Sequence, residues 1–114
     1  MEQIVESSQR REKLVKVGMS VEILELVLTA EEKFLLLAAL GRVQLESPSD
    51  AVLRVQMKTL STGSSGVRAK LVLKSSSHSF EIESRGDSTA SVIRQLEELA
   101  CAELSAWRKS RLSL

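Results

Sequence analysis

Polar and apolar residues alternate along three segments in the middle of the chain. These segments cover residues 51–60, 67–74 and 78–85, and the runs between them are short and rich in serine and glycine. Strict alternation is typical of a strand with one buried face, and short connections join neighbouring antiparallel strands. The pattern therefore predicts a three-stranded antiparallel meander. The apolar positions expected on its inner face are Leu53, Val55, Met57, Val67, Ala69, Leu71, Leu73, Phe80 and Ile82.

Farther along the chain, apolar residues recur at steps of three and four, which predicts an amphipathic helix over 88–109. Asp87 or Ser88 is the expected N-cap. Leu96 and Leu99 are expected to share the core with the meander. Trp107 and Cys101 lie near the same stripe and are interpreted as core residues, although a base-stacking platform is the alternative for Trp107.

A second helix is predicted before the meander. Thr29 is followed three residues later by Glu32, which is the spacing of a capping box. A helix over 30–40 would follow, and Gly41 is expected to end it. Because a helix beginning at Thr29 cannot include the apolar run before it, residues 21–28 are predicted to form a strand.

The predicted order is β-α-β-β-β-α, an α+β two-layer sandwich with both helices on one face of a four-stranded sheet. We expect a polar N-terminal arm over 1–17, with residues 1–12 frayed or in a short helix. A single domain over 18–111 and a tail over 112–114 would follow. The segment 61–66 resembles a flexible linker but falls where a hairpin loop is needed.

The composition argues against several classes of function but does not identify one. The 114 residues suit one domain, and 16 basic against 15 acidic side chains nearly cancel. A single cysteine (Cys101) and a single histidine (His78) give no basis for a catalytic triad, a metal site or a cofactor site. We therefore expect a binding protein rather than an enzyme. No apolar run reaches membrane-span length and no signal peptide is evident, so the cytoplasm is the expected location.

The basic residues of the meander all fall on its polar face. The acids Glu81 and Glu83 are on the same face, whereas the first 50 residues carry 6 basic and 9 acidic side chains. A one-sided positive face suggests phosphate contacts with nucleic acid. The alternative is an ordinary solvated strand face whose lysines discourage aggregation. The six basic residues are Arg54, Lys58, Arg68, Lys70, Lys74 and Arg85.

The second half of the chain resembles a known family. The strand Ala69-Lys70-Leu71-Val72-Leu73 and the strand Ser79-Phe80-Glu81-Ile82-Glu83 precede a helix that opens at Asp87-Ser88-Thr89. Regular leucines and the basic end Arg108, Lys109 and Arg111 complete a pattern similar to the ribosome hibernation-promoting factors, also called sigma-54 modulation proteins. The resemblance covers about 20–111. It implies a bacterial stress-response protein that binds small-subunit rRNA in the mRNA and tRNA channel and inhibits translation.

The resemblance and the basic face together favour the small ribosomal subunit or another structured RNA as partner. The nine candidate contacts are the six meander residues and Arg108, Lys109 and Arg111. A double-stranded-RNA-binding domain is a weaker match, because Asp87-Ser88-Thr89-Ala90 is not a basic helix start. The remaining alternative is a protein-interaction or oligomerising adaptor. The apolar run 34–40 favours it, with a homodimer through the first helix, near Leu36 or Leu37, or through an edge strand.

Overall fold

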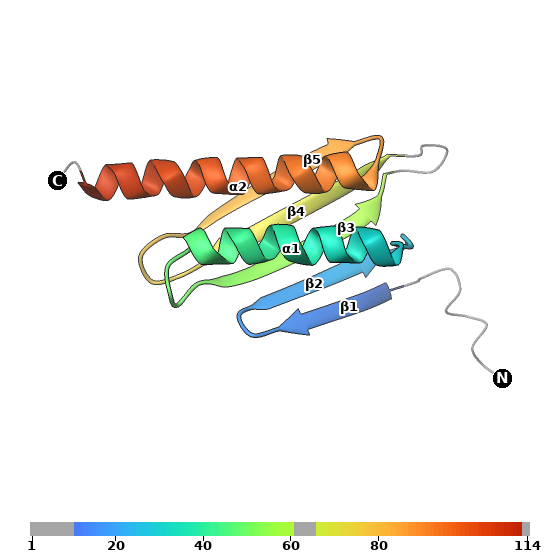
Figure 1. Cartoon of the computed structure of the whole chain (residues 1–114), viewed down its shortest axis with the longest axis horizontal. Helices are drawn as coiled ribbons and strands as arrows, with labels where there is room; N and C mark the ends of the chain where they lie inside the picture. The colour runs from blue at the N-terminus through green and yellow to red at the C-terminus, as the bar shows by residue number, and fades with distance from the viewer. Residues whose placement is uncertain (1–10, 61–65, 113–114) are drawn as a thin grey trace.

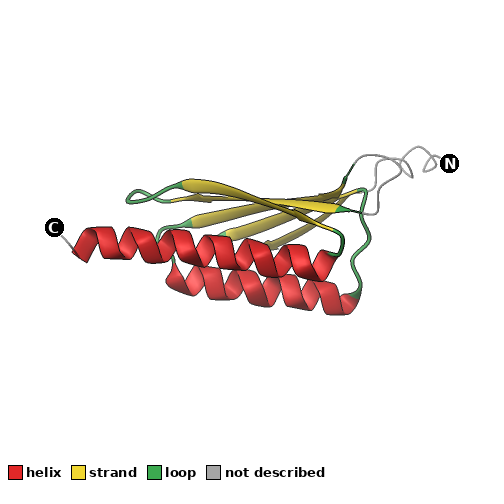
Figure 2. Cartoon of the chain, turned by 90° about the horizontal axis from the view of Figure 1, so that it is seen from above, coloured by secondary structure: helices red, strands yellow, loops and turns green. Residues whose placement is uncertain are grey.

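A five-stranded mixed sheet forms one layer of the protein, and two helices lie side by side on one of its faces (Figures 1 and 2). The computed structural model describes residues 11–60 and 66–112. This arrangement is the predicted α+β fold with both helices on one face. The strands are β1 (Arg11–Lys16), β2 (Met19–Leu24), β3 (Val52–Thr59), β4 (Val67–Lys74) and β5 (Phe80–Gly86), and the helices are α1 (Ala30–Glu46) and α2 (Thr89–Leu112).

The prediction of four strands is wrong, because the expected polar arm contributes strand β1. β1 pairs antiparallel with β2, and a two-residue turn at Val17 and Gly18 connects them. Gly18 has a φ of 74°, which favours glycine. Residues 11–16, which the prediction placed in the arm, therefore belong to the sheet. The predictions for residues 1–10, for most of the loop 61–66 and for residues 113–114 lie outside the described residues.

The first predicted strand also has different bounds. It was expected over 21–28, whereas β2 covers Met19–Leu24 and pairs in parallel with β3. Glu25 ends it with a φ of 53°, a left-handed conformation that interrupts an extended strand. Leu28 is buried and Leu26 packs against the core, so these two leucines anchor the connection to α1 rather than extend the strand, whereas Val27 between them is exposed.

Helix α1 starts where predicted and ends later. The Glu32 N–H donates to Thr29 Oγ1 at 3.0 Å, and the Thr29 N–H donates to Glu32 Oε1 at 2.9 Å, which confirms the capping box. The expected end at Gly41 is wrong, because the helix runs on to Glu46. Gly41 faces open space. A glycine in a helix costs only about 1 kcal/mol, and burial of Val43 two residues later offsets that cost.

The core lies between the sheet and the two helices. The meander pairs antiparallel, as predicted, with Leu53 opposite Leu73 and Leu71 opposite Ile82. The predicted core residues Leu53, Val55, Leu71, Leu73 and Leu96 are buried, and Phe80 and Ile82 pack against them. The expected burial of Leu99 is wrong, since 39 % of it is exposed. It lies beside the stripe of Leu96, Ala100 and Leu104 that faces the sheet.

Two ion pairs bridge the two helices. Arg42 donates from Nε to Glu97 Oε2 at 2.6 Å and from Nη2 to Glu97 Oε1 at 2.9 Å. Arg108 reaches Glu46 in the last turn of α1. At the start of α2, Ser88 Oγ accepts the Ser91 N–H at 3.2 Å, so Ser88 rather than Asp87 caps this helix. The opposite face of the sheet is left uncovered by helices, as Figure 2 shows.

Candidate nucleic-acid interface

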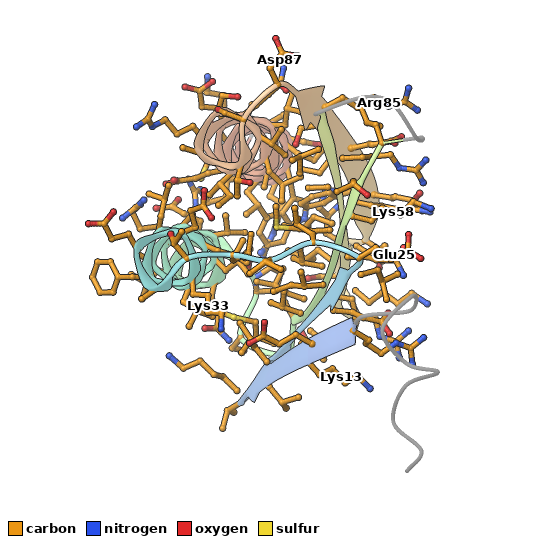
Figure 3. The ribbon with its side chains drawn as sticks, turned by 90° about the vertical axis from the view of Figure 1, so that its right-hand side faces the viewer. Lys13, Glu25, Lys33, Lys58, Arg85 and Asp87 are labelled. Carbon is orange, nitrogen blue, oxygen red and sulfur yellow. The ribbon has the colours of Figure 1, made fainter. Side chains whose placement is uncertain are left out.

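The uncovered face of the sheet, called the open face below, collects most of the basic strand residues. All six meander residues predicted there do lie on it, and β1 adds two cations that the sequence analysis did not assign. In Figure 3, Lys58 and Arg85 lie on the side of the sheet away from the helices, whereas Lys33 lies on the helix side. The basic residues of the open face are Arg11, Lys13, Arg54, Lys58, Arg68, Lys70, Lys74 and Arg85.

Acidic residues are fewer on this face. Within the strands they are Glu22, Glu81 and Glu83, and Glu25 lies on the same side just after β2 (Figure 3). Eight cations against four acids leave the open face positive, although the charge of the whole chain is only +1. The charge is therefore segregated by side, and a polyanion near the protein would be attracted to the open face.

Strand register gathers four of the cations into one row. Arg11 lies opposite Leu24, Leu24 is level with Lys58, Lys58 lies opposite Arg68, and Arg68 lies opposite Arg85. We call Arg11, Lys58, Arg68 and Arg85 the basic row. Neighbouring strands are about 4.8 Å apart, so Lys58, Arg68 and Arg85 repel one another at close range.

Half of the cations on the open face are held by its acids. Arg68 Nε lies 2.8 Å and Arg85 Nη2 3.4 Å from Glu83 Oε2, and Lys70 Nζ lies 3.0 Å from Glu81 Oε2. Arg11 Nε lies 3.1 Å from Glu22 Oε2. Exposed ion pairs of this kind contribute little to stability and exchange readily for other anions.

The other half has no acidic partner. Among residues 11–60 and 66–112, Lys13, Arg54, Lys58 and Lys74 make no ion pair, whereas Arg68 and Lys70 do. A cation without an internal partner gives up no existing contact when it binds a phosphate. These four residues are therefore the best placed to contact an added polyanion.

A hollow of about 430 Å³ lies in the middle of the open face. Lys13, Arg54 and Lys70 contribute to its walls, with Ser20, Gln56 and Val72 between them. Its one acid, Glu22, is engaged, because Oε1 accepts from Gln56 Nε2 at 3.2 Å and Oε2 faces Arg11. The remaining charge around the hollow is positive, which suits a phosphate group.

The three C-terminal cations do not join this surface. Arg108, Lys109 and Arg111 lie on α2, on the other side of the sheet. Arg108 is engaged by Glu46, and the Arg111 guanidinium lies 5.1 Å from the ring centre of Trp107. The structure thus divides the nine predicted contacts into six on the open face and three on the helical layer.

Trp107 packs within the protein. The His78 ring stacks on it with 5.5 Å between centroids and 9° between planes, and Arg111 also lies over the indole. His78 Nε2 is buried without a hydrogen bond, 3.8 Å from Glu103 Oε2. Together with its packing against the core, this arrangement favours the core interpretation of Trp107 over a base-stacking platform.

Groups suited to catalysis or metal binding are sparse. In the described part of the chain, no three His, Cys, Asp or Glu side chains gather as a metal ion would require. Burial raises the pKa of the Cys101 thiol, which keeps it protonated and unreactive at neutral pH. No helix in the described ranges is long and apolar enough to cross a membrane.

No protein-family model matches this chain, and no curated protein matches it in sequence. One solved structure similar to it is the N-terminal domain of Protein Y from Thermus thermophilus, with a TM-score of 0.47 and 13 % sequence identity. The match covers 66 % of this chain and 84 % of that chain. At this level of similarity, a functional assignment has to rest on the open face itself.

Proposed function

We propose that the open face binds the phosphate backbone of structured RNA. The observation that carries the proposal is the excess of cations there, with Lys13, Arg54, Lys58 and Lys74 unpaired within the described residues. Phosphates can occupy these side chains without breaking an ion pair of the protein, and release of condensed counterions then drives binding. The cations on the rim of the hollow provide a first contact for one phosphate.

The chemistry of the face favours backbone contacts over base recognition. Phe80 packs toward the core from the opposite side of β5, and Trp107 belongs to α2. The described strands therefore present no aromatic ring on the open face that could stack with a base. Affinity should depend strongly on salt and weakly on sequence, since phosphate contacts carry no direct sequence information.

Within structured RNA, we propose small-subunit rRNA as the target and inhibition of translation as the outcome. The resemblance of residues 20–111 to the hibernation-promoting factors supports this choice. The basic open face of the sheet is a second observation in favour of an RNA target. The cations of the helical layer, Arg108 and Arg111, are secondary in this proposal because they belong to a different side of the molecule.

A salt titration with matched variants tests the RNA proposal. We would measure binding to a fluorescent structured RNA by anisotropy between low and high salt for the parent, for Arg54→Ala/Lys58→Ala and for Arg94→Ala. Arg94 is an exposed arginine of α2, so Arg94→Ala controls for the loss of one positive charge away from the open face. Each lost phosphate contact should lower the slope of log affinity against log salt by ~0.7–0.9. Unchanged affinity and slope for the double variant would contradict the proposal.

Co-sedimentation tests the ribosomal target separately. Purified small subunits, large subunits and transfer RNA would compete for the labelled protein in sucrose gradients at low and moderate salt. Preferential co-migration with small subunits supports the ribosomal target. Equal competition by all three keeps the RNA-binding proposal and contradicts the ribosomal one.

One observation favours the adaptor alternative. Phe34 and Leu45 are 75 % and 85 % exposed, and they lie eleven residues apart on the outer side of α1, with Ala38 and Gly41 between them. Leu36 is fully buried in its own core and is not available for the expected contact, whereas Leu37 beside it is half-buried. If the open-face variants bind RNA like the parent, this outer side of α1 becomes the better candidate surface.

A further inference from the structure

Within the described residues, β1 is an edge strand of the sheet. It pairs with β2 on one side, and no strand among the described residues pairs with it on the other. Val15 is 70 % exposed and Lys16 is also exposed. An edge strand presents a row of main-chain N–H and C=O groups that another strand can pair with.

We propose that this edge pairs with β1 of a second copy, antiparallel, with Leu14 opposite Leu14 of the second copy. The two sheets then continue as one, with all four helices on the same side and both open faces on the other. The proposal does not depend on RNA binding, since it uses only the edge of β1 and its charges.

Side-chain direction limits the possible registers. In a symmetric antiparallel pair of identical strands, the residue numbers of any two facing residues add up to the same value, which defines the register. Facing residues also point to the same side of the sheet. Both helical layers lie on one side only when that sum is even. Three registers near the middle of β1 meet this condition, with sums of 26, 28 and 30, and they are centred on Lys13, Leu14 and Val15. A shift by one residue would place the helices of the two copies on opposite sides.

Charge selects the register with the sum of 28. It places Glu12 opposite Lys16 of the second copy, and symmetry repeats this pair. It also places Lys13 beside Val15 of the second copy, so that the long aliphatic part of lysine covers an exposed valine. The sum of 26 instead sets Lys13 against Lys13, and the sum of 30 removes Glu12 from Lys16. Opposite charges facing each other stabilise strand pairs, whereas like charges destabilise them.

The charges inside one copy are compatible with this pairing. Glu12 lies 2.7 Å from Lys33 Nζ, which holds its carboxylate on the helix side, where Lys16 of the second copy would lie. Lys16 itself makes no ion pair among the described residues. Dimer formation would therefore give Lys16 an acidic partner without taking Glu12 from Lys33.

The interface would be small. Pairing of the six-residue strand Arg11–Lys16 adds on the order of six main-chain hydrogen bonds. A single strand pair should bury less than the roughly 800 Å² per partner of a typical stable interface. The dimer should therefore dissociate on dilution, and its measurement needs a wide concentration range.

Cysteine cross-linking tests the register. In a Cys101→Ala background, Leu14→Cys should form a disulfide-linked dimer on mild oxidation, because facing Cα atoms of antiparallel strands are about 4.5–5.5 Å apart. Lys13→Cys is the matched control and should cross-link at least several-fold less. Equal cross-linking of both, or cross-linking of Lys13→Cys alone, would overturn the register. Circular dichroism of each variant checks that it is folded.

Charge reversal tests the interface without cysteines. In sedimentation equilibrium, Lys16→Glu should raise the dimer dissociation constant about tenfold, because Glu12 then faces a second carboxylate at two symmetric positions. Adding Glu12→Lys should restore part of the dimer affinity, because opposite charges face each other again across the strands although the ion pair of Glu12 with Lys33 is lost. Lys74→Glu, on β4 and away from the edge, is the control with the same charge change and should leave dimerisation unaltered.

Three results would overturn the proposal. The first is a parent protein that stays monomeric at millimolar concentration. The second is a dimer that Lys16→Glu leaves intact. The third is a dimer that Phe34→Glu dissociates and Lys16→Glu does not, because that result assigns the interface to α1.

Discussion

Lys58 and Arg68 face each other across strands β3 and β4, and no acidic residue lies between them. Arg68 turns toward Glu83 on the next strand, at 2.8 Å, which leaves Lys58 without an acidic partner among the described residues. The free protein carries the repulsion of this pair continuously, and a bound polyanion would relieve it. Stability and function should therefore respond in opposite directions to changes at Lys58.

Lys58→Glu should stabilise the free protein and weaken RNA binding. The substitution replaces a facing like-charge pair by an opposite-charge pair, which is worth roughly 0.2–1 kcal/mol in the free energy of unfolding. Urea denaturation and RNA anisotropy on the same preparation would measure both effects. Lys74→Glu is the matched control, because Lys74 faces the uncharged Val52 and should give no gain in stability. A loss of stability in Lys58→Glu would contradict the prediction.

Leu71→Ala should lower the free energy of unfolding by ~2–5 kcal/mol. Leu71 is fully buried at the centre of the sheet, between Val55 and Ile82. Chemical denaturation would measure the loss. Val72→Ala, one residue along on the open face, should cost clearly less. Equal costs for the two variants would mean that the assignment of the two faces is wrong.

Thr29→Ala should destabilise the protein by about 1 kcal/mol, because it removes the hydroxyl that accepts the Glu32 N–H. Thr29→Ser keeps an acceptor oxygen and should retain most of the stability. Thermal unfolding followed by circular dichroism would compare the three proteins. A Thr29→Ser protein as unstable as Thr29→Ala would show that the hydroxyl contributes nothing to the cap.

The contact between the helices should make stability depend on pH in a defined direction. Hydrogen bonds from Arg42 hold the pKa of the Glu97 carboxyl below its ordinary range, although partial burial acts the other way. A carboxyl whose pKa is lowered by folding stabilises the fold above its unfolded pKa of about 4.3 and loses this contribution as the pH falls through its folded pKa.

The parent should therefore be more stable than Glu97→Gln at neutral pH, and this difference should shrink below about pH 4.3. Urea midpoints measured from pH 3 to pH 7 would show it. Glu98→Gln, at the exposed neighbouring position of α2, is the control and should show no such trend. A difference that grows toward low pH would contradict the assigned sign.

Much of the fold could be predicted because it depends on short-range patterns. The alternation of Leu53, Leu71 and their neighbours defined the inner face of the meander, and Thr29 with Glu32 defined the start of α1. These signals act within a few residues along the chain. They can therefore be interpreted without knowledge of what packs against them.

The parts that could not be predicted depend on distant partners. β1 has only Leu14 pointing to the core among the long polar side chains of an edge strand, so its sequence lacks a strand period of its own. Pairing with β2 holds β1 in an extended conformation. Likewise, α1 continues past Gly41 because Val43 is buried against the core, which a local helix-end signal does not report.

The sequence predicted which face carries the cations, but not which of these cations form ion pairs. The alternation of side chains along β4 correctly predicted that Arg68 and Lys70 lie on the open face. Each of them, however, pairs with an acid at the diagonal position of β5 rather than with the residue facing it. Which cations remain unpaired therefore depends on strand register and side-chain direction together. Lys13 could not be assigned to the open face from the sequence, because β1 is not predicted as a strand.

The parallel pairing of β2 with β3 also bears on the order in which the chain folds. The hairpins β3–β4 and β4–β5 join neighbours in sequence, whereas β2 reaches β3 only after α1 has crossed over the sheet. Closing a long loop costs more chain entropy than closing a short one. We therefore expect β3, β4, β5 and α2 to form a folding nucleus, and the β1–β2 hairpin to dock last. The edge strand would then be the first element to exchange its amide protons and the first to open when the protein is destabilised.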